Sequence, residues 1–323
     1  MTRLGVVAIG RNEGDRLRRC LASLRDAGAR VVYVDSGSTD DSLDIARSSG
    51  VETVSLDRSA PFTAARGRNA GAEALRKGGM PEFLQFVDGD CAVVEGWLDA
   101  AVAALDADPG LGLVTGWRSE LARDVSVYNQ MCDVEWHRPA GEIRACGGDL
   151  MVRSAVFDAI GGFDPGLICS EDEDFVLRLR KAGHMARRLP RDMTSHDAHM
   201  TRFSQWWRRS LRAGHGFAEV GRRHGDHFVA ERRRAWAYGL GLPLVALTGA
   251  VWIGWIAPLG AGAIYALSWW RTARGLARSG QNPAQARRHA AFYTLAKLPH
   301  VLGMMLYHLR RLRGIRPRLI EYK

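Results

Sequence analysis

The chain has 323 residues, of which 46% are hydrophobic and 25% are charged. This composition excludes a disordered or fibrous protein, and the length suits one large domain or two ordinary ones. The formal net charge of +10 is unevenly spread: residues 1–200 carry 24 Lys and Arg against 31 Asp and Glu, whereas residues 201–323 carry 21 against 4. An acidic part joined to a strongly basic part indicates two tasks, and the basic part could meet nucleic acid or anionic lipid.

The five cysteines show no CxxC spacing and do not cluster with histidines. This pattern argues against a disulfide framework or a zinc site and favours a reducing compartment. The apolar run at the N-terminus is too short for a secretory signal. We therefore expect the first half of the chain to stay in the cytoplasm.

Short apolar runs alternate with helical patterns over the first 200 residues. The apolar runs predict strands at 4–9, 31–34, 83–87, 111–117 and 185–189. The helical periodicity predicts helices at 11–27, 40–48, 64–76, 96–105, 151–160, 172–182 and 203–220, while residues 119–145 are irregular by pattern. This alternation predicts an α/β fold with a parallel sheet, in which ligands bind beyond the carboxyl ends of the strands.

The C-terminal part contains a long stretch, Ala235–Trp270, without any charged residue. As one helix it would span about 54 Å, against about 30 Å for the hydrocarbon core of a bilayer. Pro243 and Pro258 interrupt it, and three arginines stand close to each end, so we expect both ends on the cytoplasmic side. We expect this stretch to form either a hairpin that dips into the membrane or two short spans. The alternative is a buried hairpin of a soluble domain. Ala291–Leu309 resembles a further interfacial or spanning helix.

These patterns predict two domains, an α/β domain over residues 1–230 and a hydrophobic, basic, membrane-associated helical region over residues 231–323.

The two turns that follow the first and second strands are Gly10-Arg11-Asn12-Glu13 and Asp35-Ser36-Gly37-Ser38-Thr39-Asp40. Small residues and Asp suit any strand-to-helix turn. In a functional interpretation, Asp35 accepts hydrogen bonds from a nucleobase while the turn brings backbone close to the ligand.

Two groups of acids follow later strands. Asp88 and Asp90, separated by glycine, can both reach one divalent cation such as Mg²⁺ or Mn²⁺, which would neutralise a leaving nucleoside diphosphate. Residues 170–174, Ser-Glu-Asp-Glu-Asp, open a helix, where acids either cap the helix and meet its dipole or supply a general base for an acceptor hydroxyl.

Together these residues resemble the family 2 glycosyltransferases of GT-A fold, a Rossmann-like nucleotide-sugar-binding fold. The resemblance covers about residues 4–200 and preserves the order and spacing of the motifs. The matching elements are Arg11-Asn12-Glu13, Val34 to Asp40, Gly67-Arg68-Asn69-Ala70-Gly71, Asp88 and Asp90, Gly161 to Asp164, Asp172 with Arg178, and Gly183, Pro190 and His196.

The resemblance implies a role for each matching residue. Asp172 would be the catalytic base. Helical spacing, rather than the resemblance, predicts that Asp174 pairs with Arg178 four residues later. The metal would be held by Asp88, Asp90 and His196, for which His199 is the nearest rival. The donor nucleotide would be bound by Asn12, Glu13, Asp35, Gly37, Ser38, Arg68 and Asp88.

The chain also departs from the family. Asp149 stands where many relatives carry Asn, and 205–209 reads Gln-Trp-Trp-Arg-Arg where processive synthases have Gln-x-x-Arg-Trp. The loss of the final Trp argues against a processive polymerase. On the acceptor side the resemblance suggests Asp149, Glu171, Gln205, Trp206 and Arg208.

The sequence thus predicts an inverting glycosyltransferase of glycan biosynthesis that depends on Mn²⁺ or Mg²⁺. It would move a sugar from a nucleotide-diphosphate sugar to a lipid-linked or surface-glycan hydroxyl, and it would bind no nucleic acid. We expect it at the inner, cytoplasmic membrane, with the catalytic domain on the cytoplasmic side of an anionic leaflet. The alternatives are a catalytically silent, membrane-bound sugar-nucleotide-binding protein and a basic nucleic-acid-binding protein.

Overall fold

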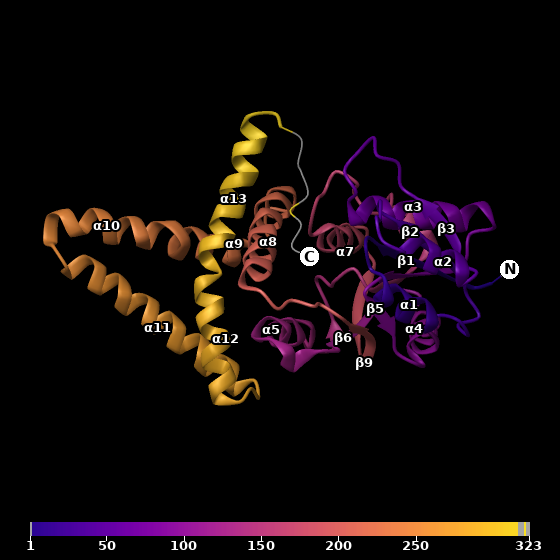
Figure 1. The fold of residues 1–323 in the computed structure, drawn as a ribbon, viewed down its shortest axis with the longest axis horizontal. Coiled ribbons are helices and arrows are strands. Elements are labelled where there is room, and N and C mark those ends of the chain that lie inside the picture. Colours follow the sequence, from indigo (N-terminus) through magenta and orange to yellow (C-terminus); the bar gives the residue numbers. More distant parts are fainter. Residues whose placement is uncertain (1, 316–319, 321–323) are drawn as a thin grey trace. The chain divides into compact units, whose positions relative to one another are not determined.

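A computed structural model describes residues 2–315 and 320. The chain divides into two compact units (Figure 1): the first comprises the residues up to Val125 together with Cys132–His199, and the second comprises Ser126–Met131 and the residues from Met200 onward. The sequence-based boundary at residue 230 differs from this division. The reason is that helix α8 (Phe203–Arg223) packs along helix α13 (Lys297–Leu312) and so belongs to the second unit.

The first unit is built on a nine-stranded sheet in the order β3-β2-β1-β4-β8-β6-β9-β5, with β7 paired to β9. The strands are β1 (Leu4–Gly10), β2 (Arg30–Asp35), β3 (Glu52–Ser55), β4 (Phe83–Asp88), β5 (Cys91–Val93), β6 (Leu111–Glu120), β7 (Gly141–Glu142), β8 (Leu150–Arg153) and β9 (Met185–His196). The expectation of a parallel sheet is correct for β1 to β4 and for β6 with β9. The sheet as a whole is mixed, because β8 runs antiparallel between β4 and β6.

Helices cover both faces of this sheet, and the alternation along each strand explains why. Along β1, Val7 and Ile9 face the layer of α3 (Ala64–Lys77), α6 (Ser154–Ala159) and α7 (Glu171–Lys181). Val6 and Ala8 face the layer of α1 (Asp15–Ala22), α2 (Ser42–Ser48) and α4 (Trp97–Ala107). The core thus lies in two apolar layers, and the carboxyl ends of β1, β2 and β4 remain available for polar residues.

Two sequence-based expectations for the middle of the chain are wrong. The start of the expected helix at 151–160 belongs to β8, because Leu150 to Val152 are buried between neighbouring strands. The irregular stretch 119–145 contains a 3-10 turn, η1 (Arg123–Val125), and helix α5 (Val127–Trp136). Helix α5 begins in the second unit and ends in the first.

The second unit is helical. Its other elements are α9 (Val229–Trp236), a π-helical turn η2 (Ala237–Gly241), α10 (Leu242–Ile253), α11 (Ile256–Arg278) and α12 (Pro283–Leu295). Gly254, at φ 60°, provides the reversal between α10 and α11, which form a hairpin. Among the described residues, one helical stretch, Val229–Ile253, is long and apolar enough to cross a membrane, with a mean hydropathy of 1.5.

Candidate active site

The turns after β1 and β2 are locked to each other. Asn12, at φ 56°, accepts the Thr39 N–H on its Oδ1 at 2.7 Å, and its own N–H donates to Oγ of Ser38 at 2.9 Å. Asp35 is 1% exposed, and its Oδ2 accepts the N–H groups of Gly37 and Ser38, each at 2.9 Å. The donor residues predicted here therefore form one rigid edge, in which Asp35 shapes the turn.

The same edge includes Glu13 and Gly37. The N–H of Glu13 donates to Oγ of Ser42 at 3.0 Å, which joins the first turn to the start of α2. Gly37 has φ 80°, and a Cβ there would lie 2.9 Å from the ring of Phe62. Only glycine fits this position without moving the aromatic ring.

Asp88, at the end of β4, lies between two arginines. Its Oδ1 accepts Nη2 of Arg68 at 2.8 Å, and its Oδ2 accepts Nη2 of Arg118 at 3.2 Å. Arg68 is 2% exposed and also donates from Nη1 to Oε1 of Glu171 at 2.6 Å. Gly148 permits this arrangement, since a Cβ there would lie 1.9 Å from Nη2 of Arg68.

Asp149 is buried beneath this cluster. Its Oδ1 accepts the backbone N–H of Asp88 at 3.0 Å, and its Oδ2 accepts the Thr194 hydroxyl at 2.8 Å and pairs with Arg118 at 2.7 Å. Asp149 is 1% exposed and Glu171 is 5% exposed. The sequence assigned Asp149 and Glu171 to the acceptor side. The structure instead places both carboxylates in buried positions, where they balance the charges of Arg118 and Arg68.

Asp90 meets His196, the histidine expected at the metal. Oδ2 of Asp90 lies 3.3 Å from Nε2 of His196, and Nδ1 of that ring lies 3.0 Å from Oε2 of the buried Glu120. Glu120 also accepts the backbone N–H of Ala198 at 3.2 Å. Burial lowers the pKa of His196 and favours the neutral ring, whose Nδ1–H then donates to Glu120 and leaves Nε2 directed at Asp90.

This group fits a divalent cation. Ligand atoms of Asp90, His196 and Cys91 lie within 4.8 Å of one another. Burial raises the pKa of the Cys91 thiol well above its usual value, and thiolates suit softer metals than Mg²⁺ or Mn²⁺. The carboxylate of Asp90 and the neutral imidazole of His196 are therefore the expected donors. A carboxylate behind the imidazole, as Glu120 is here, orients such a ligand and fixes its tautomer.

Asp172 stands at the start of α7. Its Oδ1 accepts the N–H of Glu173 at 2.9 Å, and its Oδ2 lies 4.0 Å from the position that a Cβ would take at Gly147. Burial, together with the negative charges of Glu171 and Glu173, raises the pKa of Asp172 to about 8. The expected pairing of Asp174 with Arg178 is confirmed, with Nε donating to Oδ2 at 2.8 Å.

The three predicted residues on α8 lie in the second unit. Oε1 of Gln205 accepts the N–H groups of Thr201 and Arg202, each at 3.0 Å, and so holds the start of the helix. Trp206 is 3% exposed and stacks on Tyr128, whereas Arg208 is exposed. Gln205 and Trp206 therefore stabilise their own unit.

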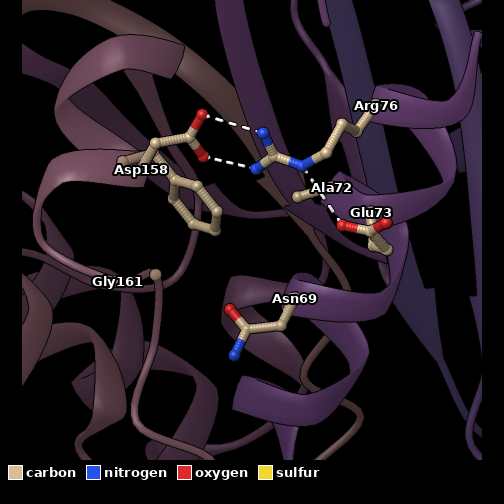
Figure 2. A pocket seen from close by; sticks show the side chains of 8 residues that line it. Asn69, Ala72, Glu73, Arg76, Asp158 and Gly161 are labelled. Carbon is tan, nitrogen blue, oxygen red and sulfur yellow. Dashed lines mark hydrogen bonds and ion pairs between the residues drawn. The ribbon is translucent and has the colours of Figure 1, made fainter.

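A hollow of about 500 Å³ lies apart from these acids, between α3 and α6 (Figure 2). Its polar groups are bonded to one another: Arg76 pairs with Asp158 and with Glu73, and Asn69 exchanges hydrogen bonds with the backbone of Phe163. These pairs join α3 to α6, and we assign the hollow no role in chemistry.

Comparison with known proteins assigns a family to part of the chain. Residues 6–145 match the family Glycosyl transferase family 2. Residues 6–145 form a family 2 glycosyltransferase domain. The pre-mycofactocin glycosyltransferases of two Mycobacterium tuberculosis strains are 29% identical to the chain over 239 residues, which cover 68% of the chain and 48% of each relative. The chain thus spans about half the length of the curated relatives that it matches.

Solved structures share the fold. The mannosyltransferase PcManGT from Pyrobaculum calidifontis, in complex with GDP-Man and Mn²⁺, superposes with a TM-score of 0.62 at 19% identity, over 95% of this chain and 87% of that one. GalNAc-T7 with UDP, GalNAc and Mn²⁺ gives 0.55 at 17% identity, over 72% and 51%. S. aureus TarS 1–349 gives 0.52 at 18% identity, over 97% and 92%. The predicted GT-A fold is confirmed.

Sequence reasoning missed two residues of the glycosyltransferase domain, Arg118 and Glu120. Both lie on β6, beyond the expected strand at 111–117, and neither stands in a recognisable motif. The available signal was the alternation of Trp117, Arg118, Ser119 and Glu120, which continues the strand pattern into polar residues.

Proposed function

We propose that the protein is a metal-dependent, inverting glycosyltransferase that moves a sugar from a nucleotide-diphosphate donor to an acceptor hydroxyl. One observation carries the proposal: buried Arg68 bridges Asp88 and Glu171, the neighbour of Asp172. The carboxylate expected at the donor and the carboxylate expected at the acceptor are thus tied to one guanidinium within a single unit. A two-substrate transfer needs this proximity.

We assign the donor nucleotide to the edge formed by β1, β2 and β4. Asp35 would receive the nucleobase through Oδ1, which accepts a hydrogen bond from the Tyr33 hydroxyl at 3.3 Å, whereas Oδ2 is held by the turn. Asn12, Glu13, Gly37 and Ser38 would line the nucleotide through their turns. Arg68 and Asp88 would lie beside the ribose and diphosphate.

A divalent cation, Mn²⁺ or Mg²⁺, would be held by Asp90 and His196, with Asp88 as a third ligand once an arginine gives way to the donor. When bound, the cation neutralises charge that develops on the leaving nucleoside diphosphate. Burial keeps the imidazole neutral, and Glu120 orients it. Arg118 stays near enough to both Asp88 and Asp149 to compensate their charge.

Asp172 is the proposed general base. It removes the proton of the acceptor hydroxyl as the oxygen attacks the anomeric carbon from the face opposite the leaving group. The transition state has oxocarbenium-ion character, as in other glycosyl chemistry. One displacement inverts the anomeric centre and requires no nucleophilic carboxylate of the protein. The raised pKa makes the ionised carboxylate of Asp172 a stronger base. Below pH 8, however, a smaller fraction of the carboxyl group is ionised.

We propose a lipid-linked or surface-glycan acceptor and attachment to the cytoplasmic membrane through the second unit. The support is the apolar helical stretch Val229–Ile253 and the surplus of Lys and Arg in residues 201–323. Arg208 is an exposed candidate for acceptor contact. The catalytic unit would lie on the cytoplasmic side.

The experiment is a panel of UDP, GDP and dTDP sugars added to the purified full chain with and without Mn²⁺. A donor at 100 times its dissociation constant should stabilise the fold by about 2.7 kcal/mol. Asp90→Ala should lose the metal-dependent part, whereas Asp99→Ala, at an exposed acid of α4, should keep it.

Release of nucleoside diphosphate from the stabilising donor completes the test. Stabilisation without any release, across a panel of hydroxyl acceptors, would identify a sugar-nucleotide-binding protein without turnover. Salt-dependent retention on DNA with no response to any donor would identify a nucleic-acid-binding protein.

A further inference from the structure

Helix α13 has two apolar faces, and only one is covered by protein. Val301, Met304 and Tyr307 are at most 5% exposed and form the small core of the second unit with Ala218 of α8 and Ala235. A Cβ at Gly303 would lie 2.0 Å from the carbonyl oxygen of Leu211, which shows how closely α8 packs on this face.

The opposite face of α13 carries an uncovered stripe. Its members follow the spacing i, i+4, i+7 and i+11, which places them on one side of a helix. They are Leu298 (37% exposed), Leu302 (45%), Met305 (42%) and Leu309 (45%). A regular stripe of exposed apolar residues indicates that this side of the helix lies against an apolar surface outside the protein.

The hairpin of α10 and α11 is the second uncovered apolar surface of this unit. Val251, Trp252, Trp255 and Ile256 are between 71% and 85% exposed, and they surround the turn at Gly254. In Figure 1 the hairpin projects from the side of α13 that faces away from α8. The free hairpin and the α13 stripe therefore belong to the same side of the helical unit.

Positive charge and aromatic rings collect where the hairpin leaves the unit. Trp236 and Trp270 are exposed there, and the guanidinium of Arg274 lies 4.6 Å from the ring centroid of Trp270. A groove of about 310 Å³ at the end of the stripe is lined by three apolar residues, Leu306, Leu309 and Ile315, and two arginines, Arg310 and Arg313. Tryptophan and arginine beside an apolar surface suit phospholipid headgroups.

We infer that α13 lies flat in the headgroup region of an anionic membrane, with its Leu298–Leu309 stripe toward the acyl chains, and that the hairpin enters the bilayer beside it. This inference rests on the proposed membrane attachment and deepens it. It makes α13 an interfacial helix, because its other face is buried against protein and cannot meet lipid.

The position of α13 limits how deep the hairpin reaches. A Cβ at Gly239 would lie 2.2 Å from the carbonyl oxygen of Lys297, so the helix leading into α10 passes α13 at this level. About 15 residues separate Gly239 from the turn at Gly254, which corresponds to about 22 Å. This is less than the hydrocarbon thickness of about 30 Å, so the tip stays inside the bilayer and both arms return to one face.

Site-specific fluorophores in vesicles test this geometry. All five native cysteines are buried, so single exposed cysteines introduced into the full chain can be labelled selectively. Labels at Leu298→Cys, Leu302→Cys and Leu309→Cys should be quenched equally and most strongly by nitroxides near the lipid headgroup. A label at Trp255→Cys should be quenched most by nitroxides near the ends of the acyl chains.

Two results would overturn the geometry. An impermeant quencher trapped inside the vesicles that reached the Trp255→Cys label would show that the hairpin crosses the bilayer. Labels on α13 that became progressively deeper from residue 298 to 309 would show that this helix is not parallel to the surface.

The matched substitutions Val251→Asp and Val125→Asp test whether lipid is the occupant. A charged residue in the hydrocarbon core costs about 3 kcal/mol on transfer into lipid, so Val251→Asp, near the tip of the hairpin, should lower vesicle partitioning about 100-fold. Val125→Asp, at an exposed valine of the first unit, should not change it. Equal partitioning of Val251→Asp and the parent, or a hairpin covered by a second copy of the chain in solution, would overturn the inference. Donor and acceptor are absent from these assays, so failure of glycosyl transfer would not affect them.

Discussion

The two units handle charge and apolar surface in opposite ways. In the first, acids of the sheet edge are paired with buried arginines, as Asp88, Asp149 and Glu171 are with Arg68 and Arg118. In the second, residues 201–323 hold 21 basic residues against 4 acids. Four acids cannot neutralise this many basic residues, so the remaining positive charge of the second unit is available for an external anion.

The same contrast holds for apolar side chains. In the described part of the first unit, only Leu121 and Val125 are large apolar residues with an exposed side chain, whereas the hairpin and α13 of the second unit expose many. Covering both faces of a sheet leaves few large apolar side chains exposed, but a helical hairpin with one neighbour cannot bury all its sides. The comparison supports the proposal that lipid covers the apolar surface of the second unit.

The largest expected effect tests whether the first unit is the chemical one. Asp172→Asn preserves size but cannot accept a proton, so turnover should fall about 10²–10⁴-fold while donor affinity stays nearly unchanged. Asp174→Asn removes the ion pair with Arg178 and should lower the melting temperature with little change in turnover. Steady-state rates and donor titrations of both variants decide. Near-normal turnover in Asp172→Asn with inactive, folded Asp174→Asn would reverse the assignment.

The next effect tests the surplus charge of the second unit. Replacing Arg271, Arg274 and Arg278 by Gln should weaken binding to anionic vesicles about 100-fold, at about 1 kcal/mol for each arginine near the surface. The control replaces two exposed arginines of the first unit, Arg18 and Arg47, whose loss should leave vesicle binding unchanged. Vesicle co-sedimentation measures both. An equal loss in the control would show that net charge, not its position, drives the attachment.

A smaller effect tests the support of the proposed metal ligand. Glu120→Gln retains the shape of the side chain but weakens its hold on Nδ1 of His196, so Mn²⁺ affinity should fall about 10–100-fold. Glu142→Gln, which removes an exposed partner of Arg180, serves as the control and should leave Mn²⁺ affinity intact. Calorimetric titration of Mn²⁺ gives both constants. Unchanged affinity in Glu120→Gln would place the cation elsewhere.

The last effect is on stability, and its sign follows from the raised pKa of Asp172. The folded protein holds this proton up to about pH 8, whereas the unfolded chain releases it near pH 4, so ionisation disfavours the folded state as pH rises between these values. Asp172→Asn should therefore melt above the parent at pH 8 and close to it at pH 4. Each kcal/mol recovered corresponds to about 2–4 °C. Parallel melting curves at both pH values, without metal or donor, would contradict the raised pKa.

Much of the first unit could be predicted from local sequence. Buried strands such as 31–34 are read from continuous apolar runs, and the turn at Asp35 from residues whose side chains bond their own backbone. Asp88 ends β4, Asp90 follows it, and Asp172 lies at the start of α7, which is where the order of the motifs predicted them. The pairing of Asp174 with Arg178 followed from helical spacing alone.

The partners of those acids were decided by the tertiary structure. Arg68 and Glu171 are 103 positions apart, and Glu120 and His196 are 76 apart, so no local pattern connects them. The antiparallel position of β8 between β4 and β6 could not be predicted either. Strands of similar composition give the same local pattern, so the pattern does not show which strands are adjacent. In the second unit the sequence determined that 235–270 is apolar and flanked by arginines. Only the tertiary structure shows which face of α13 remains uncovered, because that depends on where α8 packs. Burial is a property of pairs of elements and not of a single helix.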